Sequence, residues 1–413
     1  MTLSTPSDAP AAGAPVGPGV PPTAIFFRLL CKVAERMPYG SLRVVTPNGR
    51  TIRFVGREEP EPEATIFVKD FAFARRTALG GDIGFFESYA DGQWDTPDLA
   101  TCLYVFARNA DFIADTVAPS PIVLWLQELR HALNRNTKSG SRRNISRHYD
   151  LGNGFYEKWL DPTMTYSSAR FTDGAETLAE AQVAKYRSLA AAIELKPDEK
   201  VLEIGSGWGG FAEFAAKEFG ARVTGLTISR EQFDYARERV FRAGLADKVD
   251  FQLVDYRDAD GQYDKVASIE MFEAVGREYW PAYFASVHDR LRPGGVAGLQ
   301  VITIAERMFE HYSRSVDFIQ RYVFPGGDLP SPSILKREAE KSGLSWRGDV
   351  AFGQDYARTL AEWSRAFVNR WDDIKPLGFD ERFNKLWRFY LAYCEAGFRA
   401  ATIDVGQVAF ARA

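Results

Sequence analysis

The sequence predicts an α/β protein with a doubly wound, mostly parallel sheet, preceded by a smaller α+β domain. From Lys200 onward, short apolar runs alternate with amphipathic stretches, and this alternation is typical of a parallel sheet with helices on both faces. A glycine-rich turn at residues 205–210 follows the first apolar run. At 413 residues the chain is long enough for two domains.

The N-terminal part of the chain predicts the smaller domain. Residues 1–22 are rich in Pro, Ala and Gly, which predicts a disordered tail, and they lack the apolar core of a secretory signal. An amphipathic stretch at residues 24–37 predicts a helix, and Pro47, Asn48 and Gly49 between two alternating runs predict a hairpin. Further strand and helix patterns extend this α+β domain over residues 23–134.

Residues 135–143 are polar and basic, which predicts a linker to a larger domain at residues 144–413. The linker is either an exposed, solvated loop or a patch that meets acidic lipid headgroups. In the larger domain we expect strands at residues 200–205, 221–229, 248–256, 263–272 and 296–304, and helices at residues 209–220, 230–244 and 279–291.

Composition excludes several classes of protein. The net charge of -4 gives no sign of a nucleic-acid surface. The three cysteines and four histidines are scattered, so we predict no metal site and no disulfide framework, as in a reducing cytosol. No apolar run reaches the roughly 20 residues of a membrane span, so any membrane contact is expected to be peripheral.

The glycine turn predicts a small-molecule ligand. Its order, G-x-G-x-G-G, differs from the G-x-G-x-x-G of dinucleotide sites. Glu203 precedes the turn, and a carboxylate there suits a ligand that carries positive charge and no phosphate. S-adenosylmethionine, with its ammonium and sulfonium, fits this description. The expected contacts at this turn are Glu203, Gly205, Ser206, Gly207, Trp208 and Gly209, although the glycines could serve a tight turn alone and Trp208 could be core.

The next two strands predict the rest of this cofactor site. Thr227 ends the second strand without the usual acid, and Gln232 lies one helical turn later; both side chains can bind ribose hydroxyls. Asp255, Tyr256 and Arg257 follow the third strand, near the expected position of the adenine.

Several motifs together resemble a known family. RHYDLGNGFYEKWLDPTMTYSSARF, EIGSGWGG, GLTIS, SIEMFEAVG and YCEAGFRAATIDVGQ resemble the cyclopropane fatty acid synthases and the related mycolic acid synthases, from about Ser141 to the C-terminus. The resemblance implies a Rossmann-like, class I S-adenosylmethionine-dependent methyltransferase. It implies methyl transfer to the cis double bond of an acyl chain, usually on a membrane phospholipid, with Tyr166 and Ser167 contacting the methionine part of the cofactor.

The resemblance also implies a bound bicarbonate as the base, held by a polar cluster. Glu273, Tyr356 and Ile302 match that cluster, although Glu273 could be a surface carboxylate and Tyr356 a core residue. Ser168 stands where the family usually has cysteine, and Gln300 stands where it has histidine. Since an amide cannot take up a proton as imidazole does, the product is left open: a cyclopropane, a methylene branch, or a methyl branch that needs a separate reductase.

Two further features have alternative interpretations. Cys394 matches a cysteine proposed as catalytic in the family, but it could equally be a buried apolar residue. Residues 309–331 mix aromatic and basic side chains and form either the acyl entrance or a mobile loop with a buried anchor.

The expected protein is therefore a cytoplasmic methyltransferase, peripherally associated with the inner membrane, that acts on unsaturated phospholipid chains. Formation of a homodimer is left open. Two alternatives remain: a methyltransferase of a soluble small molecule, or a cofactor-binding protein whose catalysis has decayed.

Overall fold

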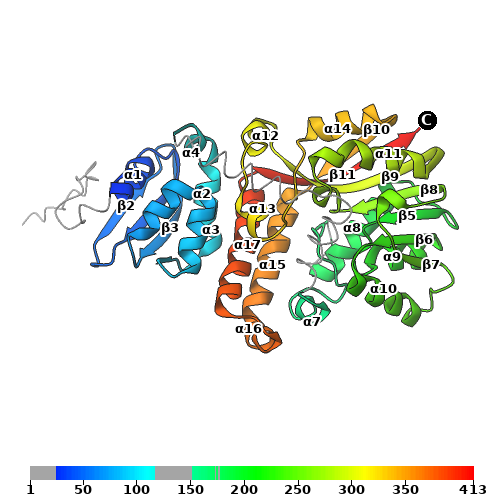
Figure 1. The fold of residues 1–413 in the computed structure, drawn as a ribbon, viewed down its shortest axis with the longest axis horizontal. Helices are drawn as coiled ribbons and strands as arrows, with labels where there is room; N and C mark the ends of the chain where they lie inside the picture. The colour runs from blue at the N-terminus through cyan, green and yellow to red at the C-terminus, as the bar shows by residue number, and fades with distance from the viewer. Residues whose placement is uncertain (1–24, 117–150, 173, 175–176) are drawn as a thin grey trace, which may run out of the picture.

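The computed structural model describes residues 25–116, 151–172, 174 and 177–413. The predicted tail at residues 1–22 and the predicted linker at residues 135–143 lie outside these residues. Figure 1 shows the smaller N-terminal domain at one end, the larger sheet at the other, and the helices α15 (Gly353–Asn369) and α17 (Glu381–Arg399) between them.

The N-terminal domain is a mixed sheet covered by helices. Its strands, β1 (Tyr39–Val45), β2 (Thr51–Val55), β3 (Glu59–Val68) and β4 (Trp94–Asp95), lie in the order β2-β1-β3-β4. The predicted hairpin is confirmed, because β1 and β2 pair antiparallel. The helices are α1 (Ile25–Ala34), α2 (Ala72–Ala90), α3 (Leu99–Arg108) and α4 (Ala110–Thr116). The predicted helix at residues 24–37 is therefore confirmed over most of its length.

The larger domain contains a sheet of seven strands within the described residues, and the predicted fold class is confirmed. The strand order is β10-β11-β9-β8-β5-β6-β7. The strands are β5 (Lys200–Ile204), β6 (Arg222–Thr227), β7 (Val249–Leu253), β8 (Tyr263–Ile269), β9 (Leu291–Ile304), β10 (Leu344–Ala351) and β11 (Ile403–Arg412). Strands β5 to β9 pair parallel, and β11 pairs antiparallel with both β9 and β10.

Helices cover both faces of this sheet. One face packs against α8 (Leu178–Ala192), α9 (Gly210–Phe219) and α10 (Arg230–Arg242), through a cluster that includes Leu189, Phe211 and Val240. The other face packs against α11 (Trp280–Arg290) and α14 (Pro332–Lys341). Thr177 and Glu180 form a reciprocal cap at the start of α8, which fixes where this helix begins.

Six further α-helices of the described residues belong to the larger domain. They are α7 (Asn153–Tyr156), α12 (Glu306–Tyr312), α13 (Phe318–Tyr322), α15, α16 (Trp371–Ile374) and α17. In Figure 1, α13 and α17 face α2 and α3 of the N-terminal domain. Among the described residues, no helix combines the length and apolar character needed to cross a membrane.

Candidate active site

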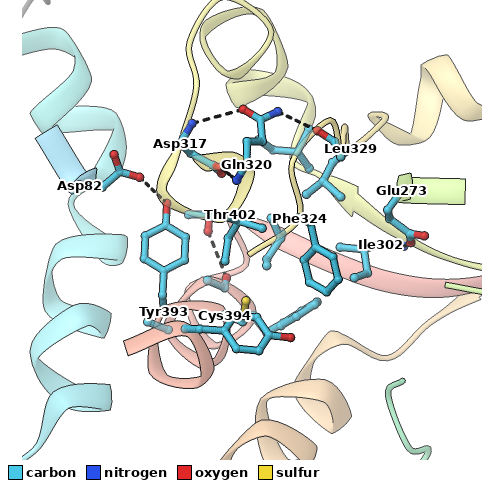
Figure 2. Close-up of a pocket in the computed structure, with 18 of the residues that line it drawn as sticks. Asp82, Glu273, Ile302, Asp317, Gln320, Phe324, Leu329, Tyr393, Cys394 and Thr402 are labelled. Atoms are coloured by element: carbon cyan, nitrogen blue, oxygen red, sulfur yellow. Dashed lines mark hydrogen bonds between the residues drawn. The ribbon is translucent and has the colours of Figure 1, made fainter. Parts of the chain in front are cut away.

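A cavity of about 860 Å³ lies at the carboxyl ends of β5, β6 and β8 and continues beneath α13 and α17. Figure 2 shows part of it, with Glu273 and Ile302 at one side and Cys394 and Tyr393 at the other. Most of the predicted site residues line this cavity: Tyr166, Ser167, Glu203, Gly205, Ser206, Gly207, Trp208, Thr227, Gln232, Asp255, Tyr256, Arg257, Glu273, Ile302, Tyr356 and Cys394. Three predicted residues, Ser168, Gly209 and Gln300, are not among its lining residues.

The glycine turn forms one end of the cavity. Gly205 and Gly207 both have positive φ, and a side chain at Gly207 would meet nothing within 4 Å, so the turn leaves open space for a ligand. Gly209 instead faces the protein interior, because a side chain there would lie 2.9 Å from Phe251. It stands at the N-cap of α9 with φ of 81°, and its expected contact with the cofactor stays a prediction.

Glu203 places a carboxyl group beside this turn. Its side chain is 3% exposed, and its Oε2 atom is buried without a hydrogen-bond partner among the described residues. Burial raises the pKa of Glu203 well above its ordinary value. An unpaired, buried acceptor of this kind fits the ammonium group of S-adenosylmethionine, whose binding would complete its hydrogen bonding.

The second and third strands provide the nucleoside end of the site. Thr227 Oγ1 donates to Gln232 Oε1 at 3.0 Å, which holds both side chains at the cavity. Asp255 Oδ2 accepts from Arg257 Nη2 at 2.7 Å. This pair lies beside Tyr256 in the cavity wall and fixes the loop after β7.

The residues matched to the methionine contacts are held by buried hydrogen bonds. The Tyr166 hydroxyl lies 2.7 Å from the Tyr390 hydroxyl, and Ser167 Oγ accepts from Lys185 Nζ at 2.7 Å. Trp208 lines the cavity and is also 4% exposed, so it packs into the core while facing the site. Its Nε1 donates to Asn153 Oδ1 at 2.7 Å.

A residue that the sequence analysis did not single out, Glu270, lies at the centre of the site. Its carboxylate accepts hydrogen bonds from the Ser168 backbone N at 2.8 Å, Gln300 Nε2 at 2.7 Å and Tyr356 Oη at 2.7 Å. The residue follows β8 with φ of 49°, a left-handed conformation that costs a residue other than glycine about 1 kcal/mol. Glu270 therefore keeps a strained backbone while its side chain gains three charge-assisted hydrogen bonds.

A second layer of buried groups orients Glu270. Gln407 Nε2 donates to Gln300 Oε1 at 3.1 Å, so the amide NH₂ of Gln300 must face the Glu270 carboxylate. Lys185, which is fully buried, provides the nearest compensating positive charge. Burial lowers the pKa of Lys185 to about 7, and burial raises the pKa of Glu270 while the charge of Lys185 opposes that rise.

This arrangement bears on the expectation of a bound bicarbonate. Tyr356, which the family resemblance assigned to the anion cluster, donates to the Glu270 carboxylate, as do Gln300 and the Ser168 backbone N at the two positions that depart from the family. The Ser168 hydroxyl donates to the Ala169 backbone O at 2.8 Å and is not directed into the cavity. A carboxylate of the chain therefore engages the Tyr356 and Gln300 donors, and the bound bicarbonate stays a prediction.

Glu273 lies one turn beyond Glu270 and faces the same cavity. Its Oε1 accepts from the Ile302 backbone N, and its Oε2 is buried without a partner among the described residues. Burial, and then the negative charge of Glu270, raise the pKa of Glu273 to about 8. The two carboxyl groups therefore differ: Glu270 has three donors and a nearby lysine, whereas Glu273 is favoured in its protonated form.

Cys394 and the segment at residues 309–331 lie in the cavity wall. Burial raises the pKa of the Cys394 thiol far above its ordinary value, so a thiolate is disfavoured there. From the segment, side chains such as Tyr312, Ile319 and Phe324 line the cavity, and Figure 2 shows Phe324 in the same cavity wall as Cys394. Within the described residues, no group of three or more His, Cys, Asp or Glu side chains is placed to hold a metal ion.

Two functional candidates, Glu270 and Lys185, escaped the sequence analysis. The sequence does contain a sign of the role of Glu270, because two glutamates three residues apart follow the β8 strand in SIEMFE. Nothing in the sequence marks Lys185 as functional, because its position in the α8 pattern is that of an ordinary helical lysine. Only the packing of α8 against the sheet buries it beside the site.

The fold and this site define a class I S-adenosylmethionine-dependent methyltransferase. A family model described as mycolic acid cyclopropane synthetase matches residues 136–408, and the chain belongs to this family. It is 39% identical over 396 residues to the tuberculostearic acid methyltransferase of Mycobacterium tuberculosis, covering 93% of this chain and 90% of that protein. It is 36% identical over 356 residues to the cyclopropane-fatty-acyl-phospholipid synthase of Escherichia coli K12, covering 84% of this chain and 88% of that protein.

A solved structure supports the same family assignment. The mycolic acid cyclopropane synthase CmaA1, complexed with SAH and CTAB, aligns with a TM-score of 0.61 at 30% identity, covering 65% of this chain and 97% of that one. The chain is therefore an S-adenosylmethionine-dependent methyltransferase of a family that acts on lipids, as the sequence predicted.

Proposed function

We propose that this enzyme transfers the methyl carbon of S-adenosylmethionine to the cis double bond of a phospholipid acyl chain, and that Glu270 takes up the proton released. The proposal depends chiefly on one observation, the Glu270 carboxylate held at the cavity by Ser168, Gln300 and Tyr356. The product we propose is a methylene-branched chain, which a separate reductase would convert to a methyl branch. The name of the mycobacterial relative, a tuberculostearic acid methyltransferase, supports this class of substrate.

The chemistry requires a dry site and a base. Bound cofactor supplies an electrophilic methyl carbon, and the π electrons of the alkene form the new bond to it. The acyl chain then carries a cation, which water would trap, so the apolar lining around Ile302, Phe324 and Phe398 protects it. Nearby rings such as Tyr356, which stacks on Phe398 at 4.4 Å between centroids, stabilise positive charge further.

The cation is quenched by loss of a proton to Glu270. Loss of a proton from the new methyl group leaves its electron pair in a C=C bond and gives a methylene branch. If the same electron pair closes on the cationic carbon, the product is a cyclopropane. This second product is the alternative supported by the name of the Escherichia coli relative. Both products need one base. Burial raises the pKa of Glu270, and a carboxylate with a raised pKa takes up a proton more readily.

Contact with a membrane surface is the second part of the proposal. On α1, the apolar side chains Ile25 and Leu29 are 67% and 48% exposed, and Arg28 and Lys32 are exposed on the same helix. Exposed apolar residues beside basic ones are typical of helices that lie on anionic lipid surfaces. We therefore propose a peripheral association with the inner membrane through α1.

Incubation with cofactor labelled in its methyl group and an unsaturated phospholipid tests the reaction. We expect label in the lipid, and NMR and mass spectrometry then distinguish a methylene branch from a cyclopropane. Label in small molecules from a cell extract but never in lipid would favour a soluble substrate. No transfer at all by folded protein that still binds the cofactor would indicate decayed catalysis.

A further inference from the structure

The cavity does not end in the catalytic domain. It continues past α13 and α17 into the N-terminal domain, where apolar side chains such as Leu30, Val44, Phe54, Ile66 and Ala107 line it. These residues come from α1, β1, β2, β3 and α3, so this part of the cavity, the N-terminal chamber, lies between the small sheet and its helices. We propose that the N-terminal chamber holds one tail of a two-tailed lipid while the other tail reacts beside Glu270. This inference rests on the proposed function.

The apolar lining of the chamber suits a hydrocarbon occupant better than water. Apolar side chains around a void lose their dispersion contacts, and the free energy of unfolding falls as the void grows. The chamber is apolar throughout its lining from α1 and the strands, so ordered water would find few partners there. A hydrocarbon tail would restore the missing contacts.

A break in α2 opens the wall between the two domains. Gly80 and Gly81 lie inside this helix, and Gly81, with φ of 58° and ψ of -136°, interrupts it. Neither glycine is required by close packing, because a side chain at either would meet nothing within 4 Å. Both line the cavity, and the helix that carries them, α2, contacts α13 and α17. The glycines thus leave space in the helix at the point where a ligand would cross it.

A band of polar side chains, the polar belt, separates the N-terminal chamber from the part of the cavity beside Glu270. Asp82, at the end of the break in α2, accepts from Tyr393 Oη of α17 at 3.0 Å and from the Phe318 backbone N at 3.0 Å. Asp317 and Gln320 lie in the same stretch of the cavity wall, as Figure 2 shows. These groups hydrogen-bond one another, so the belt is a polar band in an otherwise apolar wall. A lipid with a polar centre between two tails matches the apolar, polar and apolar order of the cavity.

Photocrosslinking of the wild-type enzyme tests the placement directly. The probe is a phosphatidylethanolamine with one oleoyl tail and one saturated tail that ends in a diazirine. We expect crosslinked peptides from residues 25–116 together with methylation of the oleoyl tail. Crosslinks confined to the catalytic domain would overturn the inference. If the enzyme methylates neither this lipid nor an oleoyl lysophospholipid, the proposed function fails instead.

A chamber-filling variant provides a kinetic test. Ala107→Phe should lower kcat/KM for dioleoyl phosphatidylethanolamine by about tenfold or more. In the same detergent micelles, its kcat/KM for oleoyl lysophosphatidylethanolamine should stay within about twofold of wild type. Thr51→Phe, which adds the same ring at an exposed site on β2, should change neither. Gly80→Leu, at the opening in α2, repeats the test if Ala107→Phe lowers Tm. Equal effects on both lipids, or no effect on either, would contradict the proposal.

Discussion

The phenol of Tyr356 donates a hydrogen bond of 2.7 Å to Glu270 Oε2. Tyr356 comes from α15 and Glu270 from the end of β8, so the bond joins two segments that are 86 residues apart in the chain. The Ser168 backbone and Gln300 supply two more donors to the same carboxylate. We infer that the site carries its base as a side chain of the protein, positioned before substrate binds.

Removing this base should slow methyl transfer. Glu270→Gln keeps the size of the side chain but cannot accept a proton, so we expect the rate of product formation to fall by about 10² to 10⁴. Cofactor affinity should change little, because Glu203 and the glycine turn remain intact. Rapid-quench measurement of labelled lipid, with calorimetric titration of the cofactor, tests both statements. A variant that retains wild-type rates would show that Glu270 is structural.

Glu203 should control cofactor affinity. Its buried Oε2 is unpaired in the described residues, and a charge-assisted hydrogen bond to the cofactor ammonium contributes about 1.5 to 3 kcal/mol. Glu203→Gln should therefore weaken S-adenosylmethionine binding by roughly 10- to 100-fold in calorimetric titration. Glu218→Gln, on the exposed side of α9, is the matched control and should bind normally. Equal affinities for all three proteins would place the ammonium elsewhere.

Glu273 should make the folded enzyme less stable as pH rises. Its pKa is about 8 in the folded protein against an ordinary 4.5, so between these values the folded state holds a proton that the unfolded state has lost. Stability from this group therefore falls as pH rises from about 4.5 to about 8. Glu273→Gln, which can still accept from the Ile302 backbone, should raise Tm above pH 8 and leave it unchanged near pH 4.5. A Tm difference that does not vary with pH would contradict the raised pKa.

Cys394 should be dispensable for chemistry. Its raised pKa disfavours the thiolate near neutral pH, and no step in the proposed reaction uses a thiol. Cys394→Ala should keep kcat/KM within about threefold of wild type, the residual change reflecting a slightly larger cavity. A loss of activity of the size expected for Glu270→Gln would assign the cysteine a direct role.

The fold was predictable from the sequence because its signals are local. The alternation of apolar runs and amphipathic stretches from Lys200 onward sets the parallel strands, and the glycine turn after β5 marks their functional end. The antiparallel insertion of β11 between β9 and β10 was not predicted in detail, since strand order depends on pairing between distant segments.

The site was predictable only in part. Single motifs located Glu203, Thr227 and Glu273 near one cavity, because each lies at or just after the carboxyl end of a strand of the same sheet. The sequence pattern could not show that Gln300 is turned by Gln407 toward Glu270, or that Lys185 is buried beside them. Those relations arise from packing between α8, β9 and β11. They bring a carboxylate of the chain to Tyr356, one of the residues for which the family resemblance implied a bound anion.

The most direct test of this account is the bicarbonate dependence of Glu270→Gly. Glycine suits the positive φ at this position, and its small size frees the donors of Ser168, Gln300 and Tyr356 for an external anion. The account predicts that methyl transfer by the wild-type enzyme does not depend on bicarbonate, whereas added bicarbonate restores activity to Glu270→Gly by about tenfold or more. A wild-type enzyme that loses activity when bicarbonate is removed, or a Glu270→Gly variant that is fully active without it, would contradict the account.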